Sequence, residues 1–214
     1  TSVADFYYQI FNSCKVPVAS IGTLGIKSKN KKIKTNLTSP DIISLHKNLE
    51  KLKKKKIDNV IIEASSHGLE QGRLDKLNFK IGIFTNFSQD HLDYHKSMNA
   101  YLNAKLILFK KLLSKNSYVI ADGSSKEFSI LKKISKKRKL RLIDSSINIR
   151  ETKDIPKSFS GTFQLKNLAM ATLAAKISKL HNFKIKQAIQ NIKNVEGRLE
   201  LVKKFPNKVK VFLD

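Results

Sequence analysis

The segment EASSHGLEQGRLDKLNFKIGIFTNFSQDHLDYH, residues 63 to 95, holds most of the side chains of this sequence that could take part in chemistry. At or near the ends of its two apolar runs it places one carboxylate, two hydroxyls, a guanidinium and three imidazoles, at Glu63, Ser65, Ser66, Arg73, His67, His91 and His95. Carboxylate oxygen is a preferred ligand of hard cations such as Mg²⁺. An arginine fork can hold a phosphate or carboxylate by two parallel hydrogen bonds. We therefore expect a site for a metal ion and a phosphate group.

Two apolar runs must position these groups. NVIIEA at 59–64 and FKIGIFTNF at 79–87 are nearly continuous in apolar residues, which is typical of strands buried in a parallel sheet. In an open α/β sheet, ligands bind beyond the carboxyl ends of the strands. Because the polar groups lie at or near those ends, we expect them to converge on one crevice.

Helix and strand patterns alternate along the rest of the chain. They predict an α/β fold with a doubly wound, mostly parallel sheet. Serines are expected to cap two of the helices, Ser39 just before Pro40 and Ser97 before the next long amphipathic run. A polar, turn-rich loop is expected at 27–40 and a small antiparallel excursion at 145–163. Helices are predicted near 2–14, 41–55, 97–113, 127–137, 166–180 and 184–193, and strands near 18–22, 59–64, 79–87, 117–121, 140–144 and 208–214.

Length and composition set further bounds. With 214 residues the chain suits one domain, or one and a half, and can bury a substantial core. Its only cysteine, Cys14, permits no internal disulfide. No apolar stretch is long enough to cross a membrane or to resemble a secretory signal. We expect a cytoplasmic protein without a membrane partner, and a monomer.

The net charge of +25 raises the question of a nucleic-acid partner, because a clustered basic face attracts phosphates. Lysine and arginine together number 42, but arginine occurs only at positions 73, 138, 141, 150 and 198. A surface that specifically binds nucleic-acid phosphates is expected to contain more arginine, because its planar guanidinium can donate two parallel hydrogen bonds to a phosphate. The lysines are spread over runs such as KKIK, KLKKKK and KKISKKRK. Compositional bias towards lysine explains the charge better, and we expect no nucleic-acid partner.

A series of longer motifs resembles a known family. TSVADFYYQIF, SIGTLG, LTSPD, EASSHGLEQGRLD, FTNFSQDHLDYH, AYLNAKLILF, NLAMATLAA and VEGRLE are similar, in this order, to the central ATPase domain of the Mur ligases. The resemblance covers nearly the whole chain and implies that residues 1–214 are this ATP-binding domain. The family's phosphate loop and N-terminal domain would precede Thr1, and its C-terminal domain would follow Asp214. We therefore expect residues 1–214 alone to be inactive.

The resemblance implies roles for residues that look ordinary in isolation. Thr1 and Ser2 would bind nucleotide phosphates at a helix N-terminus, and the Thr1 hydroxyl would coordinate Mg²⁺. Glu63 and His91 match the family's Mg²⁺ ligands, although a solvated glutamate and a helix-capping histidine are the ordinary alternatives. Lys105, fourteen residues after His91, matches a lysine that CO₂ carbamylates, so that it would help to hold a second Mg²⁺. His67 and His95 are expected to lie next to these ligands and to orient them without binding the metal.

The implied substrate contacts come from loops around the same crevice. They are Thr38, Ser39, Ser65, Gln71 and Arg73, and they would bind a UDP-MurNAc-dipeptide. A simple helix cap is the alternative role for Thr38 and Ser39. The family often has asparagine where this chain has Leu37, so one side-chain contact is missing or replaced.

The final third of the chain would complete the ATP site. The family pattern GxFNxxN occurs as GTFQLKN, so Asn167 matches whereas Gln164 replaces an asparagine. Arg198 would stabilise charge on the γ-phosphate, and Asp214 would also contact the ATP site. In isolation, Arg198 looks like part of a turn and Asp214 like a solvated carboxylate.

The implied reaction is amide formation driven by ATP and Mg²⁺. The dipeptide carboxylate attacks the γ-phosphate, and the amine of an amino acid then displaces phosphate from the acyl phosphate, with His91, Lys105 and Arg198 as the catalytic groups. The family member implied adds the third amino acid of the peptidoglycan stem, diaminopimelate or lysine. Three alternatives stay open: a sister ligase or folylpolyglutamate synthetase, a basic nucleic-acid-binding module, and a non-catalytic remnant.

Overall fold

The computed structural model describes residues 1–214 except 30, 148–161, 199, 205–209 and 214. Its helices are α1 (Ser2–Ser13), α2 (Ile42–Lys54), α3 (Ser66–Glu70), α4 (Leu92–His95), α5 (Met98–Ile107), the π-helix η1 (Leu108–Leu112), α6 (Phe128–Arg138), α7 (Thr162–Ile177) and α8 (Asn182–Gln190). Its strands are β1 (Val18–Gly22), β2 (Gly25–Ser28), β3 (Lys31–Ile33), β4 (Asn59–Ile62), β5 (Phe79–Phe84), β6 (Leu113–Ala121), β7 (Arg141–Asp144), β8 (Glu200–Lys204) and β9 (Lys210–Leu213).

The strands form one mixed sheet, one parallel sheet and one hairpin. In the first, the order is β3-β2-β1-β4, and β1 pairs with β4 in parallel. In the second, β5, β6 and β7 are all parallel, while β8 and β9 pair antiparallel. Alternating helices and strands with parallel pairing confirm the predicted α/β fold.

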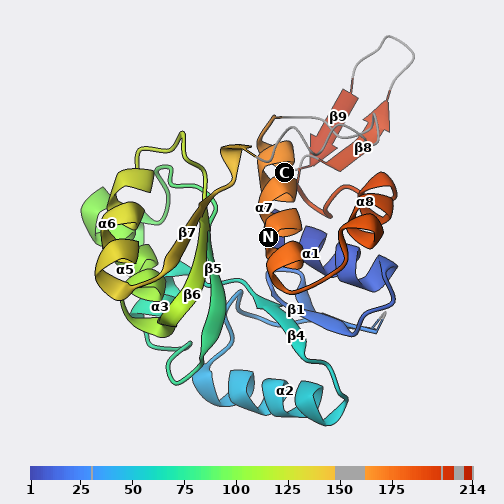
Figure 1. Ribbon diagram of the computed structural model, residues 1–214, viewed down its shortest axis with the longest axis horizontal. Coiled ribbons are helices and arrows are strands. Elements are labelled where there is room, and N and C mark those ends of the chain that lie inside the picture. Colours follow the sequence, from blue (N-terminus) through green and yellow to red (C-terminus); the bar gives the residue numbers. More distant parts are fainter. Residues whose placement is uncertain (30, 148–161, 199, 205–209, 214) are drawn as a thin grey trace.

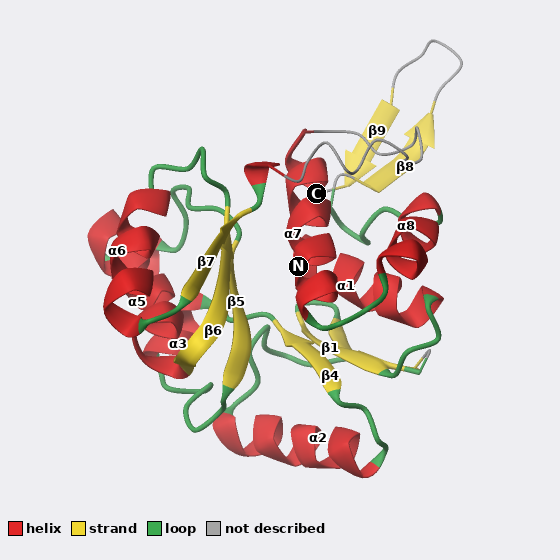
Figure 2. Ribbon diagram, in the orientation of Figure 1, coloured by secondary structure: helices red, strands yellow, loops and turns green. Residues whose placement is uncertain are grey.

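Two apolar cores lie on the two sides of the sheets. One is built from α1, α7 and α8, which surround fully buried side chains such as Phe6, Ile10 and Leu168. The other joins α2, α5, η1 and α6 to the opposite faces, and it includes Leu45 and Phe109. Figures 1 and 2 show α5 and α6 on the outer side of β5–β7, and α7 beside α1 on the other side. Helices on both sides are what a doubly wound arrangement requires.

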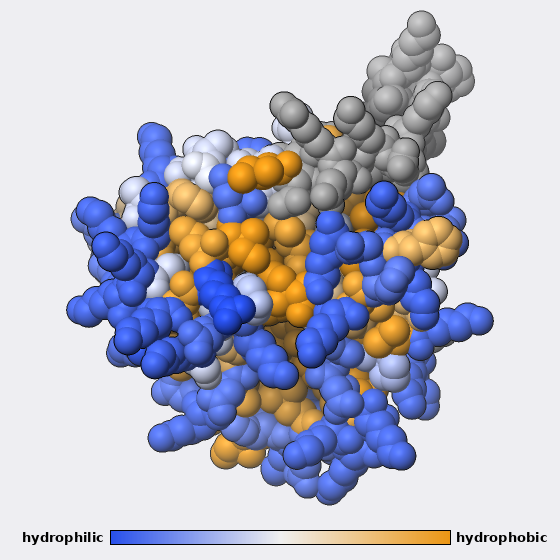
Figure 3. Space-filling model, in the orientation of Figure 1, coloured by the Kyte–Doolittle hydropathy of each residue, from blue (hydrophilic) through white to orange (hydrophobic). Residues whose placement is uncertain are grey.

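The face of the molecule seen in Figure 3 is largely polar. Hydrophilic residues cover most of its left, lower and right margins, and an apolar area lies near the centre. Among the described residues, no helix has both the length and the apolar character needed to span a membrane.

The structure corrects two predictions for the polar loop at 27–40. Its first part forms the β2–β3 hairpin, in which Ile26 pairs with Ile33 and Lys27 with Lys32. Its last part does not cap the next helix with Ser39. Asp41 is the cap of α2, and its Oδ1 accepts a hydrogen bond from the Ser44 backbone N–H at 2.9 Å.

The predictions for the helix that begins after Ser97 are confirmed in part. The Ser97 cap is confirmed, since its Oγ accepts from the Ala100 N–H at 3.2 Å. The predicted helix 97–113 ends as a regular α-helix at Ile107, and η1 follows it. The expected excursion at 145–163 lies largely outside the described residues.

Candidate functional site

Glu63 stands directly after β4, beside the end of β1. Its backbone N–H donates to the Ile21 carbonyl at 2.8 Å, which continues the parallel pairing of the two strands by one residue. Gly22 at the end of β1 leaves room for the Glu63 side chain, because a Cβ there would lie 2.1 Å from Glu63 Oε1. The carboxylate is therefore packed against the end of β1.

Two threonine hydroxyls donate to the same carboxylate oxygen. Thr1 Oγ1 lies 3.0 Å and Thr23 Oγ1 2.9 Å from Glu63 Oε2, and the two hydroxyls are 3.2 Å apart. The Thr23 backbone N–H donates to Glu63 Oε1 at 3.1 Å. Because Thr1 is the N-cap residue of α1, this oxygen cluster lies at a helix N-terminus, where backbone N–H groups favour anions. We call Thr1, Thr23 and Glu63 the oxygen cluster.

Two of the residues predicted from distant motifs reach the oxygen cluster. The guanidinium Nη2 of Arg198 lies 3.4 Å from Thr1 Oγ1, although 197 positions separate the two residues. Thr38 Oγ1 lies 3.2 Å from Thr23 Oγ1. A cation and a further hydroxyl therefore border the carboxylate.

The predicted substrate residues form a second group around Ser39. This serine is fully buried, and its Oγ donates to the Glu63 carbonyl at 2.8 Å and lies 3.0 Å from Ser65 Oγ. Arg73 Nη1 donates to the Ser39 carbonyl at 2.9 Å, and Arg73 Nη2 donates to Gln71 Oε1. The structure thus brings Ser39, Ser65, Gln71 and Arg73 together beside Glu63.

The imidazoles form a third group with two tyrosines. The ring of His67 lies 5.0 Å from that of His91, 5.3 Å from that of His95 and 4.1 Å from that of Tyr94, measured between centroids. His95 is buried, and its Nε2 lies 2.9 Å from Ser66 Oγ. Burial, with the neighbouring imidazoles as a smaller cause, lowers the pKa of His67. His67 therefore favours the neutral imidazole.

Tyr101 connects Lys105 with this histidine group. The Lys105 ammonium lies 5.1 Å from the centre of the Tyr101 ring, and the His91 ring lies 5.8 Å from the same ring. Burial lowers the pKa of Lys105, while the Asp90 carboxylate acts in the opposite direction. A lowered pKa increases the neutral amine fraction, which is the form that reacts with CO₂.

The shared metal site of Glu63 and His91 stays a prediction. Glu63 belongs to the oxygen cluster, and His91 and Lys105 border Tyr101. One segment, 63–67, contributes side chains to all three groups, and this places them along one stretch after β4. In the part of the chain that the structure describes, no three His, Cys, Asp or Glu side chains form a metal-binding cluster.

The remaining predicted residues have no tested role. Ser2 is buried in the first turn of α1, and Asn167 is half-buried on α7. Asp214 lies outside the described residues. Gln164, which stands where the family motif has asparagine, is buried and donates from Nε2 to the Arg198 carbonyl at 3.3 Å.

Some residues of the site carried no predicted role. Thr23 lies in the motif SIGTLG, and a hydroxyl directly after the end of a predicted strand was the available signal. Asp90 and Tyr94 lie in the motif FTNFSQDHLDYH, from which only the histidines were predicted as site residues. Tyr101 looks like an ordinary core aromatic on a helix, and only the fold reveals its position between Lys105 and His91.

Residues 1–194 match the family model of the Mur ligase middle domain. This chain belongs to the Mur ligase family. The match covers the oxygen cluster, the Ser39 group and the histidine group, so each belongs to the family domain. Arg198 lies just beyond the matched residues.

Named relatives agree with this family. A Brucella melitensis protein named UDP-N-acetylmuramoyl-L-alanyl-D-glutamate–2,6-diaminopimelate ligase is 33% identical over 225 residues, covering 94% of this chain and 46% of the relative. A Rickettsia bellii protein of the same name is 33% identical over 240 residues, covering 100% of this chain and 50% of the relative. This chain therefore spans about half the length of these relatives.

Solved structures share the fold. A structure of UDP-N-acetylmuramoyl-L-alanyl-D-glutamate–2,6-diaminopimelate ligase superposes with a TM-score of 0.78 at 22% identity, covering 96% of this chain and 46% of that one. A bifunctional folylpolyglutamate synthase/dihydrofolate synthase from Yersinia pestis gives a TM-score of 0.70 at 14% identity, covering 100% of this chain and 60% of that one.

Proposed function

We propose that this domain is the ATP-binding part of an amide ligase that adds the third amino acid to UDP-MurNAc-L-Ala-D-Glu in the cytoplasm. The observation that carries the proposal is the oxygen cluster with Arg198, at the N-terminus of α1 and beyond the paired ends of β1 and β4. This is where an open α/β sheet binds a phosphate group. The family and the names of the relatives support the reaction class.

The residues present fit Mg²⁺ bound to a nucleotide. Thr1, Thr23 and Glu63 offer hydroxyl and carboxylate oxygens within 3.2 Å of one another. Mg²⁺ is held by few protein oxygens together with waters and substrate phosphates, and it would neutralise charge on the transferring phosphoryl group. Arg198, 3.4 Å from Thr1 Oγ1, would stabilise the remaining charge from the other side.

The group around Ser39 would bind the dipeptide substrate. Arg73 is already oriented by the Ser39 carbonyl and Gln71, and this leaves its guanidinium little freedom to lose when it binds a carboxylate. The Thr38 hydroxyl lies between this group and the oxygen cluster. Attack of the substrate carboxylate on the γ-phosphate requires such adjacency of the two subsites.

We further propose that Lys105 becomes carbamylated and that His91 acts beside it. The lowered pKa of Lys105 supports this proposal, because carbamylation needs the neutral amine. The product would be an anion next to Tyr101 and the histidine group, suited to a second Mg²⁺. Asp90, the charged neighbour of Lys105, would add a further carboxylate.

The names of the relatives favour diaminopimelate over lysine as the incoming amino acid. The direct test is to purify the full-length gene product and supply ATP, Mg²⁺, UDP-MurNAc-L-Ala-D-Glu and diaminopimelate. Phosphate release should require all three substrates, and mass spectrometry should find the dipeptide extended by one diaminopimelate. Phosphate release with a folate and glutamate in place of these substrates would contradict the proposal. So would salt-dependent nucleic-acid binding without nucleotide turnover.

A further inference from the structure

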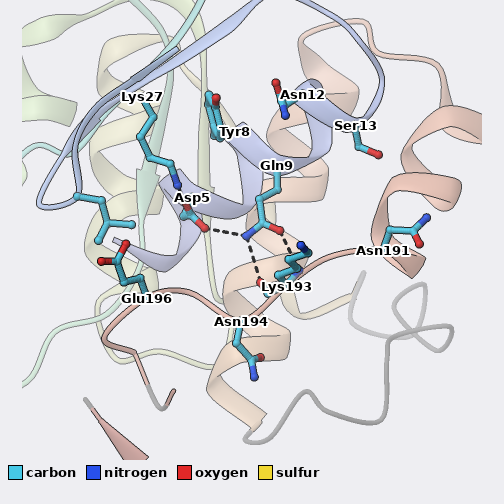
Figure 4. Close-up of a pocket in the computed structure, with 11 residues that line it drawn as sticks. Asp5, Tyr8, Gln9, Asn12, Ser13, Lys27, Asn191, Lys193, Asn194 and Glu196 are labelled. Atoms are coloured by element: carbon cyan, nitrogen blue, oxygen red, sulfur yellow. Dashed lines mark hydrogen bonds and ion pairs between the residues drawn. The ribbon is translucent and has the colours of Figure 1, made fainter. Parts of the chain in front are cut away.

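Gln9 holds the segment that leads to Arg198 against α1. Its Oε1 accepts from the Lys193 backbone N–H at 2.8 Å, and its Nε2 donates to the Lys193 carbonyl at 3.1 Å. One side-chain amide thus pairs with both backbone groups of a residue 184 positions away (Figure 4). Such two-point pairing fixes the orientation of a loop as well as its distance from the helix.

A buried carboxylate fixes Gln9 in turn. Gln9 Nε2 also donates to Asp5 Oδ2 at 2.7 Å, one helical turn earlier on α1. Asp5 is only 4% exposed, and its other oxygen, Oδ1, is paired with the Lys27 ammonium of β2. These groups line one side of an open pocket of about 400 Å³ between α1, β2 and the segment 191–196. The Gln9 amide therefore cannot rotate freely.

The backbone between Lys193 and Arg198 has few ways to move. Val195 is fully buried in the core beside α1. The Glu196 carboxylate also pairs with Lys32 of β3 at 2.7 Å, although this pair is exposed and adds little to the restraint. The Arg198 N–H then donates to the Val195 carbonyl at 3.1 Å, which closes a tight turn. Gly197 has φ +63 in this turn, a conformation that residues with a side chain rarely adopt.

A second amide holds the far end of the segment. Gln164 of α7 is 4% exposed and donates to the Arg198 carbonyl at 3.3 Å. The guanidinium of Arg198 then reaches Thr1 Oγ1. The segment is thus fixed at Lys193 by α1 and at Arg198 by α7, and α1 is the helix whose N-terminus carries Thr1.

We propose that Gln9 is a positioning residue for phosphoryl transfer. It fixes the position of the 193–198 segment along α1, so that the Arg198 guanidinium reaches the oxygen cluster. This inference rests on the proposed function of Arg198. A residue two turns from the proposed phosphate site thus controls the position of the Arg198 guanidinium. Because a shift of about 1 Å in such a group lowers a rate by up to about a hundredfold, a loosened segment should be visible in turnover.

The test uses the full-length gene product and the ligase assay. Gln9→Met keeps the length and shape of the side chain but removes its hydrogen bonds. It should lower kcat about tenfold and leave KM for the UDP-linked dipeptide unchanged. Gln187→Met, the same change at an exposed position of α8, is the matched control and should behave as wild type. Gln9→Asn, one methylene shorter and still polar, keeps the test valid if Gln9→Met fails to fold, and it should lower kcat similarly.

The decisive readout is a double variant with Arg198→Ala. Arg198→Ala alone should lower kcat about 10²- to 10³-fold, and adding Gln9→Met should then have no further effect. Equal losses from Gln9→Met with and without Arg198 would overturn the inference and leave the proposed function standing. So would wild-type kcat in Gln9→Met while Arg198→Ala is impaired. Normal turnover in Arg198→Ala would instead overturn the role of Arg198, and with it the inference.

Discussion

Glu63 gains its distinctive character from its surroundings. Its Oε2 accepts hydrogen bonds from the hydroxyls of Thr1, the N-cap of α1, and Thr23, which follows β1, and Gly22 leaves the space that its side chain fills. Hydrogen bonds to a carboxylate are stronger than neutral ones, so this oxygen has a fixed position. Motif comparison found Glu63, but the two partners Thr23 and Gly22 were found only through the fold.

At this residue, Glu63→Gln should lower ligase turnover of the full-length product about 10²- to 10³-fold, because it removes one well-placed charge from the proposed metal site. The control is Glu50→Gln on α2, an exposed carboxylate that pairs with Lys54 one turn away. Such a pair contributes little. Comparable turnover in the two variants would rule out Glu63 as a metal ligand.

For Lys105, replacement by alanine should depress turnover by about 10²- to 10³-fold, and a small added carboxylic acid should partly restore it. Lys105→Arg should not restore activity, because guanidinium keeps its positive charge and cannot be carbamylated in the same way. Lys110→Ala, an exposed lysine on η1 that donates to Asn103, is the control. Near-normal turnover in both Lys105 variants would make it a packing residue only.

Burial of Lys105 also predicts a pH dependence of stability. Its pKa in the folded protein lies below the ordinary value of 10.5, so between these two values the unfolded chain binds more protons than the folded one. The free energy of unfolding should therefore rise with pH across this window. In CO₂-free buffer, Lys105→Met should be more stable than wild type at neutral pH, with the difference shrinking towards pH 10.5. Urea denaturation at several pH values measures it, and a difference that grows with pH would contradict the burial effect.

At the level of secondary structure, the sequence was most informative where a strand packs against apolar side chains on both faces. The runs 59–64 and 79–87 were predicted as strands because residues of β4 and β5 pack against both apolar cores and leave an apolar signature. The β2–β3 hairpin was missed because β3 is an exposed edge strand rich in lysine, with no apolar alternation. Lysine on an edge strand opposes pairing with other chains, and it also hides the strand from pattern analysis.

The junction of β1 and β4 can be tested by adding one methyl group. In Gly22→Ala, the new Cβ would stand 2.1 Å from Glu63 Oε1, so the carboxylate or the strand end must move. We expect a loss of about 1–3 kcal/mol in the free energy of unfolding, as is usual for overpacking. Urea denaturation of the domain measures this loss. Gly22→Ala combined with Glu63→Ala should recover part of it, since the clash is then absent. No recovery would mean that the strain lies in the backbone.

At the scale of the whole molecule, residues far apart in sequence form the candidate site. Thr1 and Arg198 are 197 positions apart in the sequence, yet Arg198 Nη2 lies 3.4 Å from Thr1 Oγ1. They meet because α1 and the segment after α8 pack on the same apolar core. The motifs allowed each residue to be predicted singly. Their mutual contacts depend on how both sheets and the two apolar cores assemble. The spacing of motifs along the chain does not predict that assembly. The same reason explains why Tyr101 escaped prediction.

We propose that the oxygen cluster and the histidine group serve one metal and nucleotide site. The most direct measurement is a crystal structure of the full-length product with Mn²⁺, a non-hydrolysable ATP analogue and the UDP-linked dipeptide, in which anomalous scattering locates the metal. We expect Mn²⁺ at about 2.1 Å from a Glu63 carboxylate oxygen, with His91 and Lys105 bordering the same crevice. A metal bound away from Glu63 would contradict this shared site. So would a Glu63 carboxylate more than about 12 Å from the His91 ring, because metal bonds and bridging waters cannot span that distance.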